Sequence, residues 1–340
     1  MKKIALIFLI GLQTIALMAQ NDKPLIVASA SMIADMAQSV GGDHIDVEMI
    51  VPIGGDPHLH EPTPANAQLV TQADLILING LTFEGWINEL IENSGTDAQT
   101  VTVTEGVRVL KSQTYENSAD PHAWMDAANG IIYARNIKDA LIKLDPANEK
   151  AYQGNYLAYV EQLSILDQEI LRSMQTIPEE KRVLITSHDA FQYYGNKYGI
   201  KLEAIMGIST EAEAQTSDII RVNKAIREQN IPAIFVESTI NPKLIEQLAH
   251  DNGITIGGKL YADSLGDKDS PASSYIDMLR YNTQTIVSAL NQEVGESITQ
   301  SHDDDNHGHN GGGQSHRSFI WILAGLMLLG LVLLIYRLNK

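Results

Sequence analysis

Residues 127–174 read AANGIIYARNIKDALIKLDPANEKAYQGNYLAYVEQLSILDQEILRSM, and this stretch limits the architectures that the chain can adopt. It is rich in Ala, Leu, Ile, Glu, Gln and Lys, its apolar residues recur at helical spacing, and almost none of it resembles a strand. Asp145-Pro146 divides it into two helices, because the residue before a proline is pushed out of the helical region and proline is accepted at a helix start. The second helix is predicted from about 148 to 174, roughly 40 Å long at the α-helical rise.

On both sides of this stretch, short β-rich runs alternate with helical segments, which is typical of α/β domains. The strand-like runs are 25–28, 45–51 and 75–79 before it and 183–186, 202–206, 233–237 and 255–261 after it. An eight-stranded βα barrel would need strands where the helical stretch lies. We therefore expect an α/β fold of two similar lobes bridged by one long rigid helix, with a cleft between the lobes.

The chain divides into six predicted segments: a signal peptide at 1–19, an N-terminal lobe at 22–145, a linking helix at 146–177, a C-terminal lobe at 182–296, a flexible His-rich linker at 297–317 and a transmembrane helix at 318–336. The signal peptide is indicated by Lys2 and Lys3 followed by an apolar run. The eighteen residues 319–336 carry no charge and span ~27 Å as a helix, enough for a bilayer.

Arg337 and Lys340 follow the predicted membrane helix, so the positive-inside rule places the C-terminus in the cytoplasm. The body of the protein is then expected to be extracytoplasmic, on the periplasmic face, and anchored in the inner (cytoplasmic) membrane by its C-terminal helix.

Composition excludes several classes of protein. The 340 residues contain 24 Lys and Arg against 42 Asp and Glu, a formal net charge of −18, which makes nucleic acid a poor partner. The sequence contains no Cys, so disulfides and thiolate zinc sites are excluded. Any metal site must be built from His, Asp and Glu.

Four residues with metal-binding side chains lie near the ends of predicted strands or in loops. His58 follows a strand, His122 lies in a loop before the helical stretch, and His188 and Asp263 each closely follow a strand. In open α/β sheets ligands collect at the carboxyl ends of the strands, so these side chains are expected to converge in the cleft. Three imidazoles and one carboxylate would complete a tetrahedral set for a divalent metal.

Six segments of the chain carry a resemblance to a known family: DPHLHEPTP from Asp56, ADLILING from Ala73, DPHAWMD from Asp120, SHDAFQYYGNKYGI from Ser187, FVEST from Phe235 and YADSLGD from Tyr261. Over about 24–290 the chain resembles the zinc/manganese solute-binding proteins of bacterial metal ABC importers. The resemblance implies two α/β lobes bridged by a rigid helix, with one divalent transition metal held between them and delivered to a membrane permease with its ATPase. It implies a receptor rather than an enzyme, with no organic cofactor.

Carried over residue by residue, the family's ligands fall on His58, His122, His188 and Asp263. The third ligand is His or Glu among relatives, and His188 favours Zn²⁺, with Mn²⁺ or iron as alternatives. The chain departs from the family at His60, where relatives carry an aromatic residue; His60 is either an extra ligand or a side chain at the cleft rim. Many relatives are lipidated on an N-terminal Cys, whereas this chain has none.

Neighbouring residues have weaker assignments. Glu237, Asp189 and Asp126 are candidates to accept hydrogen bonds from the ligand imidazoles, although strand-end or capping roles fit them equally well. Thr210 and Glu213 match a capping box at the start of a helix over 211–229.

Two alternatives come from other classes of protein. A metal-dependent hydrolase could use the pair His58-Leu59-His60 with His122, His188 and Asp263, but it would need a barrel and an open coordination position. An adhesion protein could retain the same fold, and it would then be expected to have a degraded site.

Overall fold

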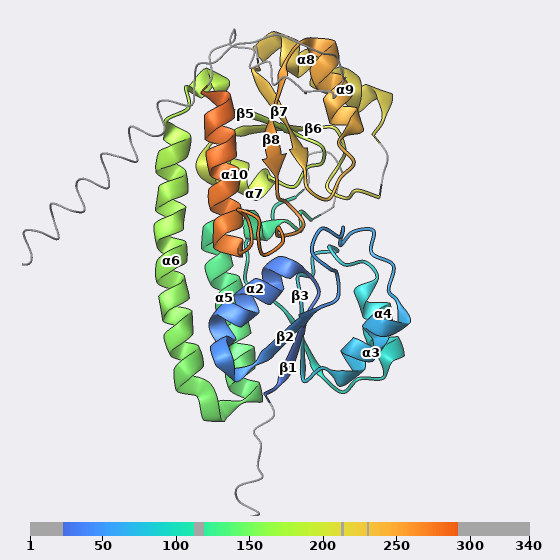
Figure 1. Ribbon diagram of the computed structural model, residues 1–340, viewed down its shortest axis with the longest axis vertical. Helices are drawn as coiled ribbons and strands as arrows, with labels where there is room; N and C mark the ends of the chain where they lie inside the picture. Colours follow the sequence, from blue (N-terminus) through green and yellow to red (C-terminus); the bar gives the residue numbers. More distant parts are fainter. Residues whose placement is uncertain (1–22, 112–118, 212–213, 230, 292–340) are drawn as a thin grey trace, which may run out of the picture. The chain divides into compact units, whose positions relative to one another are not determined.

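Two α/β lobes follow one another along the chain and are joined by long helices (Figure 1). The computed structural model describes residues 23–111, 119–211, 214–229 and 231–291, all within one compact unit, Met1–Glu296. The predicted signal peptide, His-rich linker and membrane helix lie outside these residues. Among the helices that the structure describes, none is both long and apolar enough to cross a bilayer.

The N-terminal lobe is built on a parallel sheet with strand order β2-β1-β3-β4. The strands are β1 (Leu25–Ala28), β2 (Asp46–Met49), β3 (Leu75–Ile78) and β4 (Gln99–Thr102). The central strands, LIVA and LILI, are wholly apolar because helices cover both of their faces. Helix α2 (Ser31–Gly41) covers one face, and α3 (Pro64–Gln72) and α4 (Ile87–Ser94) cover the other.

The C-terminal lobe contains two parallel strand pairs, β5 (Val183–Thr186) with β6 (Lys201–Ala204), and β7 (Ala233–Glu237) with β8 (Thr255–Leu260). Its helices are α7 (Gln192–Tyr198), α8 (Thr216–Gln229), α9 (Lys243–Asn252) and α10 (Tyr275–Leu290). All four strands lie where the sequence predicts them, to within two residues.

The start of α8 was wrong in the sequence prediction, because Thr210 does not cap a helix. The helix begins at Thr216, and the carboxylate of Asp218 accepts the backbone N–H of Gln215 at 3.3 Å. The hydroxyl of Thr210 donates instead to Oδ2 of Asp56 in the other lobe, at 2.6 Å.

The linking segment consists of α5 (Ala127–Leu144), a short turn η3 (Pro146–Asn148) and α6 (Glu149–Gln175). The break between the helices falls at Asp145-Pro146, as predicted, and Oδ2 of Asp145 accepts hydrogen bonds from Asn148 and Tyr152 at 2.7 Å each. The 27 residues of α6 confirm the long helix predicted over 148–174. The exact division into domains stays a prediction.

One hydrophobic core runs through both lobes and the linking helices. Trp124, in the short turn η2 (Ala123–Met125), is fully buried in it, and its Nε1–H donates to the carbonyl of Ala262 at 3.0 Å. The hydroxyl of Tyr275 in α10 donates to the carbonyl of Trp124. The lobes therefore share packing rather than meeting only through a linker.

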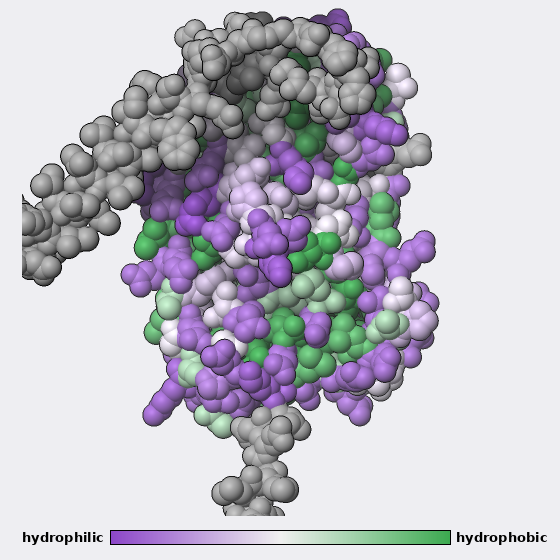
Figure 2. All heavy atoms as spheres, viewed as in Figure 1, coloured by the Kyte–Doolittle hydropathy of each residue, from purple (hydrophilic) through white to green (hydrophobic). Residues whose placement is uncertain are grey.

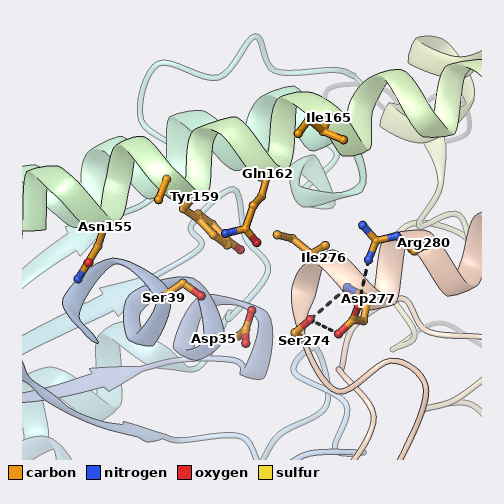
Figure 3. A pocket seen from close by; sticks show the side chains of 11 residues that line it. Asp35, Ser39, Asn155, Tyr159, Gln162, Ile165, Ser274, Ile276, Asp277 and Arg280 are labelled. Atoms are coloured by element: carbon orange, nitrogen blue, oxygen red, sulfur yellow. Dashed lines mark hydrogen bonds and ion pairs between the residues drawn. The ribbon is translucent and has the colours of Figure 1, made fainter. Parts of the chain in front are cut away.

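A polar groove of about 480 Å³ lies where α2, α6 and α10 meet (Figure 3). Here Oδ2 of Asp35, in α2, accepts the backbone N–H of Tyr275, the first residue of α10, at 2.9 Å. Burial raises the pKa of Asp35 to about 6. On the face shown in Figure 2 the surface is mostly hydrophilic, with hydrophobic side chains gathered over the N-terminal lobe.

Candidate metal centre

His58 lies in the loop that follows β2. The backbone at Gly54 has φ +81°, a left-handed conformation that glycine adopts most readily, and this turns the loop back toward the cleft. Oδ1 of Asp56 then accepts the backbone N–H of His58 at 2.9 Å. The rings of His58 and Phe83 meet edge to face, with 4.9 Å between their centroids and 83° between their planes. The backbone hydrogen bond and this ring contact together fix the imidazole.

His122 lies in a second Asp-Pro-His turn, just before η2. Oδ1 of Asp120 accepts its backbone N–H at 2.9 Å and lies 2.8 Å from its Nδ1. The turn is held from the sheet, because Nδ2 of Asn79, directly after β3, donates to the carbonyl of Pro121 at 2.9 Å. A carboxylate at Nδ1 keeps the proton of the neutral imidazole on that nitrogen, so Nε2 is the atom whose lone pair can bind a metal.

His188 follows β5 and is fixed in the same way by Glu237, the last residue of β7. Its backbone N–H donates to Oε1 of Glu237 at 2.8 Å, and Oε2 lies 2.6 Å from its Nδ1. Both side chains are buried. Two of the three imidazoles therefore direct Nε2 inward and present Nδ1 to a carboxylate.

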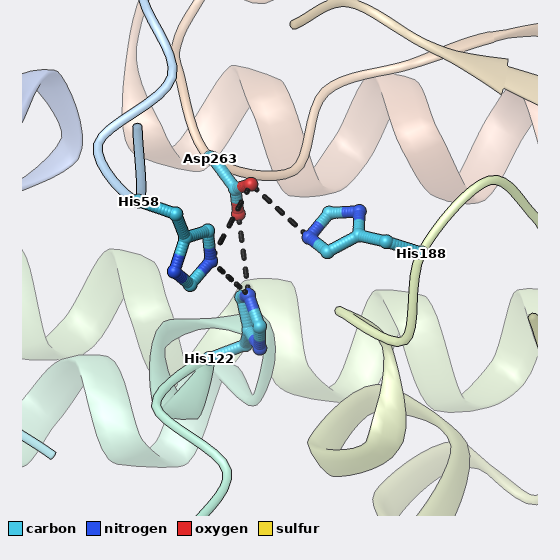
Figure 4. Close-up of side chains that lie close together, drawn as sticks. All are labelled: His58, His122, His188 and Asp263. Carbon is cyan, nitrogen blue, oxygen red and sulfur yellow. Dashed lines mark hydrogen bonds and ion pairs between the residues drawn. The ribbon is translucent and has the colours of Figure 1, made fainter. Parts of the chain in front are cut away.

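Asp263 follows β8 and faces the three imidazoles (Figure 4). Its Oδ2 lies 3.1 Å from Nε2 of His188, and its Oδ1 lies 3.4 Å from Nε2 of His122. Nε2 of His58 lies 3.9 Å from Oδ2 and 3.3 Å from Nε2 of His122. The four side chains are buried, and one potential ligand atom from each lies within 4.8 Å of all the others.

Opposite charges control the protonation of this cluster. Burial and the nearby imidazoles lower the pKa of His58 to about 3, although Asp263 acts in the opposite direction. Burial alone would lower the pKa of His122, but the carboxylates of Asp120 and Asp263 raise it to about 9. Glu237 and Asp263 likewise hold the pKa of His188 well above its usual value, against the effect of burial.

The aspartate of the cluster is ionised. Burial favours its neutral form, but the imidazoles of His188 and His122 hold the pKa of Asp263 well below its usual range. Both of its oxygens are buried and make no hydrogen bond of good geometry among the described residues, although the imidazole nitrogens lie 3.1–3.9 Å away. Buried polar atoms without partners are uncommon, and a divalent cation would satisfy them together with the inward-facing nitrogens.

Comparison with known proteins agrees with this geometry. Residues 26–289 match the model of a family described as zinc-uptake complex component A, periplasmic. The chain belongs to this family. It is 36% identical over 280 residues to the metal ABC transporter substrate-binding lipoprotein SsaB of Streptococcus sanguinis, a match that covers 80% of this chain and 91% of that protein.

Other relatives of this zinc-uptake family member are named for different metals. The manganese ABC transporter substrate-binding lipoprotein PsaA of Streptococcus pneumoniae is 35% identical over 282 residues, covering 81% of this chain and 91% of its own. The solved structure of the periplasmic zinc-binding protein TroA from Treponema pallidum has a TM-score of 0.75 at 34% identity, covering 79% of this chain and 99% of that one. The resemblance noted in the sequence is confirmed.

The structure brings together the four candidate residues predicted at the strand ends, and it places Glu237 against His188 as expected. His60 is not part of this group. Its ring lies 4.8 Å from that of Trp86, and its Nε2 lies 3.2 Å from Oδ1 of Asn66, so of its two expected roles the structure supports the side chain at the cleft rim.

The two other carboxylates suggested as partners of the imidazoles have ordinary roles. Asp189 accepts a hydrogen bond from Gln192 at 2.7 Å, and Asp126 caps α5 through the backbone N–H of Ala128 at 2.9 Å. The partner that sequence reasoning missed is Asp120, whose Oδ1 lies 2.8 Å from Nδ1 of His122. Its position two residues before His122, across a proline, is the signal that was available.

Proposed function

We propose that this member of the zinc-uptake family is the extracytoplasmic receptor of a metal ABC importer and that it captures one divalent transition metal with His58, His122, His188 and Asp263. The observation that carries the proposal is the convergence of these four buried side chains from both lobes. Its partners would be the cognate permease and ATPase. This part of the proposal is supported by relatives such as SsaB, which is named as the substrate-binding lipoprotein of a metal ABC transporter.

The arrangement suits binding better than catalysis. Four protein ligands fill the coordination of a tetrahedral metal, whereas a hydrolytic centre keeps one position open for water. The Nε2 atoms of His122 and His188 both approach Asp263, which leaves little room for a substrate. The hydrolase alternative therefore has no support in the geometry, and the intact cluster gives none to an adhesion protein with a degraded site.

Zn²⁺ is the proposed metal, with Mn²⁺ as the alternative. Imidazole suits zinc, whereas a second carboxylate would favour manganese, and the third position here is His188. Relatives named for manganese and for zinc both match the chain at similar identity. Competition between the two ions on the purified protein decides between them.

We also propose that 318–336 anchors the receptor in the inner membrane. Relatives are named lipoproteins, and the present sequence contains no Cys that could carry a lipid. The uncharged apolar run followed by Arg337 supports a membrane helix with a cytoplasmic end.

Elemental analysis of residues 22–296 tests the metal site. Without affinity tag or chelator, the wild-type fragment is expected to contain or take up one equivalent of zinc or manganese. A His58→Ala, His122→Ala double variant should lose it, while the exposed control His250→Ala should retain it. Failure of the wild-type fragment to take up either metal on titration would contradict the receptor proposal.

A further inference from the structure

The loop that carries His58, residues 54–58, is held by the C-terminal lobe at two points. The backbone N–H of Gly54 donates to Oγ of Ser264 at 2.8 Å, and the hydroxyl of Thr210 donates to Oδ2 of Asp56 at 2.6 Å. Both bonds join residues more than 150 positions apart in the chain. Among the described residues these are the hydrogen bonds that join this loop to the opposite lobe, and Nε2 of His58 also lies 3.9 Å from Oδ2 of Asp263.

Asp56 connects the hydrogen bond from Thr210 to the candidate ligand His58. While Oδ2 receives the hydroxyl of Thr210, Oδ1 accepts the backbone N–H of His58. A side chain of the C-terminal lobe is thus connected to the backbone of His58 through one carboxylate. If the lobes part at this point, the bond from Thr210 breaks and the orientation of Asp56 is freed.

His58 depends on this loop more than the other two imidazoles depend on theirs. His122 and His188 each have a carboxylate within 2.8 Å of Nδ1. The ring of His58 has no such partner in the described part of the chain, and its nearest carboxylate oxygen belongs to Asp263, 3.9 Å from Nε2. The position of the His58 ring is therefore set by its loop and by packing against Phe83.

We propose that Thr210 is a positioning residue that latches the 54–58 loop to the C-terminal lobe and slows release of the bound metal. The inference rests on the proposed function, since it takes His58 to be a ligand. His58 has no carboxylate at Nδ1 among the described residues, so we take it as the first ligand that a departing metal loses. The loop can carry His58 away only after the Thr210 to Asp56 hydrogen bond has broken.

The test measures the rate at which the full-length protein, loaded with Zn²⁺, releases the metal into excess chelator. Thr210→Val keeps the shape of the side chain and removes the donor, and a hydrogen bond of ordinary strength predicts release about three- to tenfold faster. Thr210→Ser restores the hydroxyl and should restore the wild-type rate. The matched control is Ser209→Ala, which removes a hydroxyl that bonds only within its own loop, to the backbone of Glu211.

A second measurement reports on the latch without any metal. The sequence contains no Cys. Two cysteines introduced by Gln72→Cys on α3 and Lys243→Cys on α9 are therefore the only residues that react with a thiol-specific spin label. Thr210→Val should shift the distance distribution between the lobes toward longer or broader values, and Thr210→Ser should not. A Thr210→Val variant with the wild-type release rate would overturn the latch, and so would one with the wild-type distance distribution.

The two proposals fail in different ways. A wild-type protein that takes up no metal contradicts the receptor function whatever the label distances show. A wild type that binds metal and a Thr210→Val variant that releases it at the wild-type rate contradict the latch alone. Faster release in Ser209→Ala as well would show that the loop containing Ser209 and Thr210, and not the hydroxyl of Thr210 itself, governs release. That result would also overturn the proposal.

Discussion

Asp120 lies against both the backbone and the ring of His122, and its negative charge keeps the proton of the neutral imidazole on Nδ1, away from the cluster. An amide at this position can donate to Nδ1 and place the proton on Nε2, where it would block a metal. We expect Asp120→Asn to weaken metal binding by about 10- to 100-fold, the usual effect of losing such a partner. Competition with a chelator of known affinity measures the change.

Asp189→Asn is the matched control for this prediction. Asp189 is also a carboxylate close to the cluster in sequence, next to His188, but it bonds Gln192 and not an imidazole. Its replacement should change metal affinity by less than about threefold, the scale of one ordinary hydrogen bond. Equal losses in Asp120→Asn and Asp189→Asn would show that general negative charge, and not the fixed tautomer, supports binding.

The protonation of the cluster predicts that metal binding releases protons. With pKa values of about 9 for His122 and well above the usual value for His188, both rings are doubly protonated imidazolium ions near pH 7.5, while His58 is neutral. A metal needs their lone pairs, so it displaces these protons, and affinity should rise with pH until His122 has titrated. At lower pH, protons compete with the metal for the imidazole nitrogens, and the affinity for the metal falls.

Calorimetry in buffers of different ionisation enthalpy counts the protons released. About two per metal are expected near pH 7.5, with a steep loss of affinity as the pH falls toward 6. Binding with no proton release, or with an affinity that is unchanged between pH 6 and 8, contradicts the charge state derived from the structure.

At the scale of elements, the contact between α5 and α10 leaves no room for a side chain at Gly130. A Cβ added there would lie 2.8 Å from the hydroxyl of Tyr275, which is itself bonded to Trp124. Gly130→Ala should therefore lower the free energy of unfolding by about 1–3 kcal/mol, as overpacking of a core does. Urea unfolding of the metal-free protein measures it.

Gly154 in α6 supplies a control of opposite sign. No atom lies within 4 Å of a Cβ built there, and the residue is exposed. Gly154→Ala should raise the free energy of unfolding by about 0.5–1 kcal/mol, because alanine loses less conformational freedom in a helix. Destabilisation by both substitutions would mean that the tight contact at Gly130 is not the cause.

Sequence pattern predicts the long helix and the wholly apolar strands most directly. Helix α6 is long and strandless, and β1, β3 and β5 are short apolar runs, so pattern alone predicts them. Strand β4 reads QTVT with no buried residue, and helix α3 has one buried residue, Val70. Strand β4 is held by its pairing with β3, and helix α3 by its capping box and by packing beside α4, and not by an apolar pattern of their own.

The contacts of the metal centre also divide into those that the sequence predicts and those that it does not. Ligands collect at the carboxyl ends of strands, so the sequence places His58, His188 and Asp263 in a cleft between two facing lobes, together with His122 from a loop. The hydrogen bond from Thr210 to Asp56 joins residues 154 positions apart, and no local pattern predicts it. Only the closure of one lobe against the other creates such a contact.

At the scale of the whole molecule, both lobes supply candidate ligands and share one hydrophobic core. A bound metal would therefore add a second connection between the lobes, on the side of the core where the chain is made of loops. The first connection, through α6 and the packing around Trp124, does not depend on metal. Metal should consequently change the local stability of the loops far more than that of the linking helix.

Hydrogen exchange with and without Zn²⁺ tests this distribution. Binding at a concentration 1,000-fold above the dissociation constant stabilises the folded state by about 4 kcal/mol through mass action. Amides that open locally, in residues 54–58 and 261–265, should gain protection first, because closing the site restricts them directly. Hydrogen exchange of the amides in the middle of α6 should slow only as much as the metal reduces global unfolding. In the His58→Ala, His122→Ala variant neither change should occur, and equal protection along the entire wild-type chain would show that the metal does not act by joining the two lobes at this cluster.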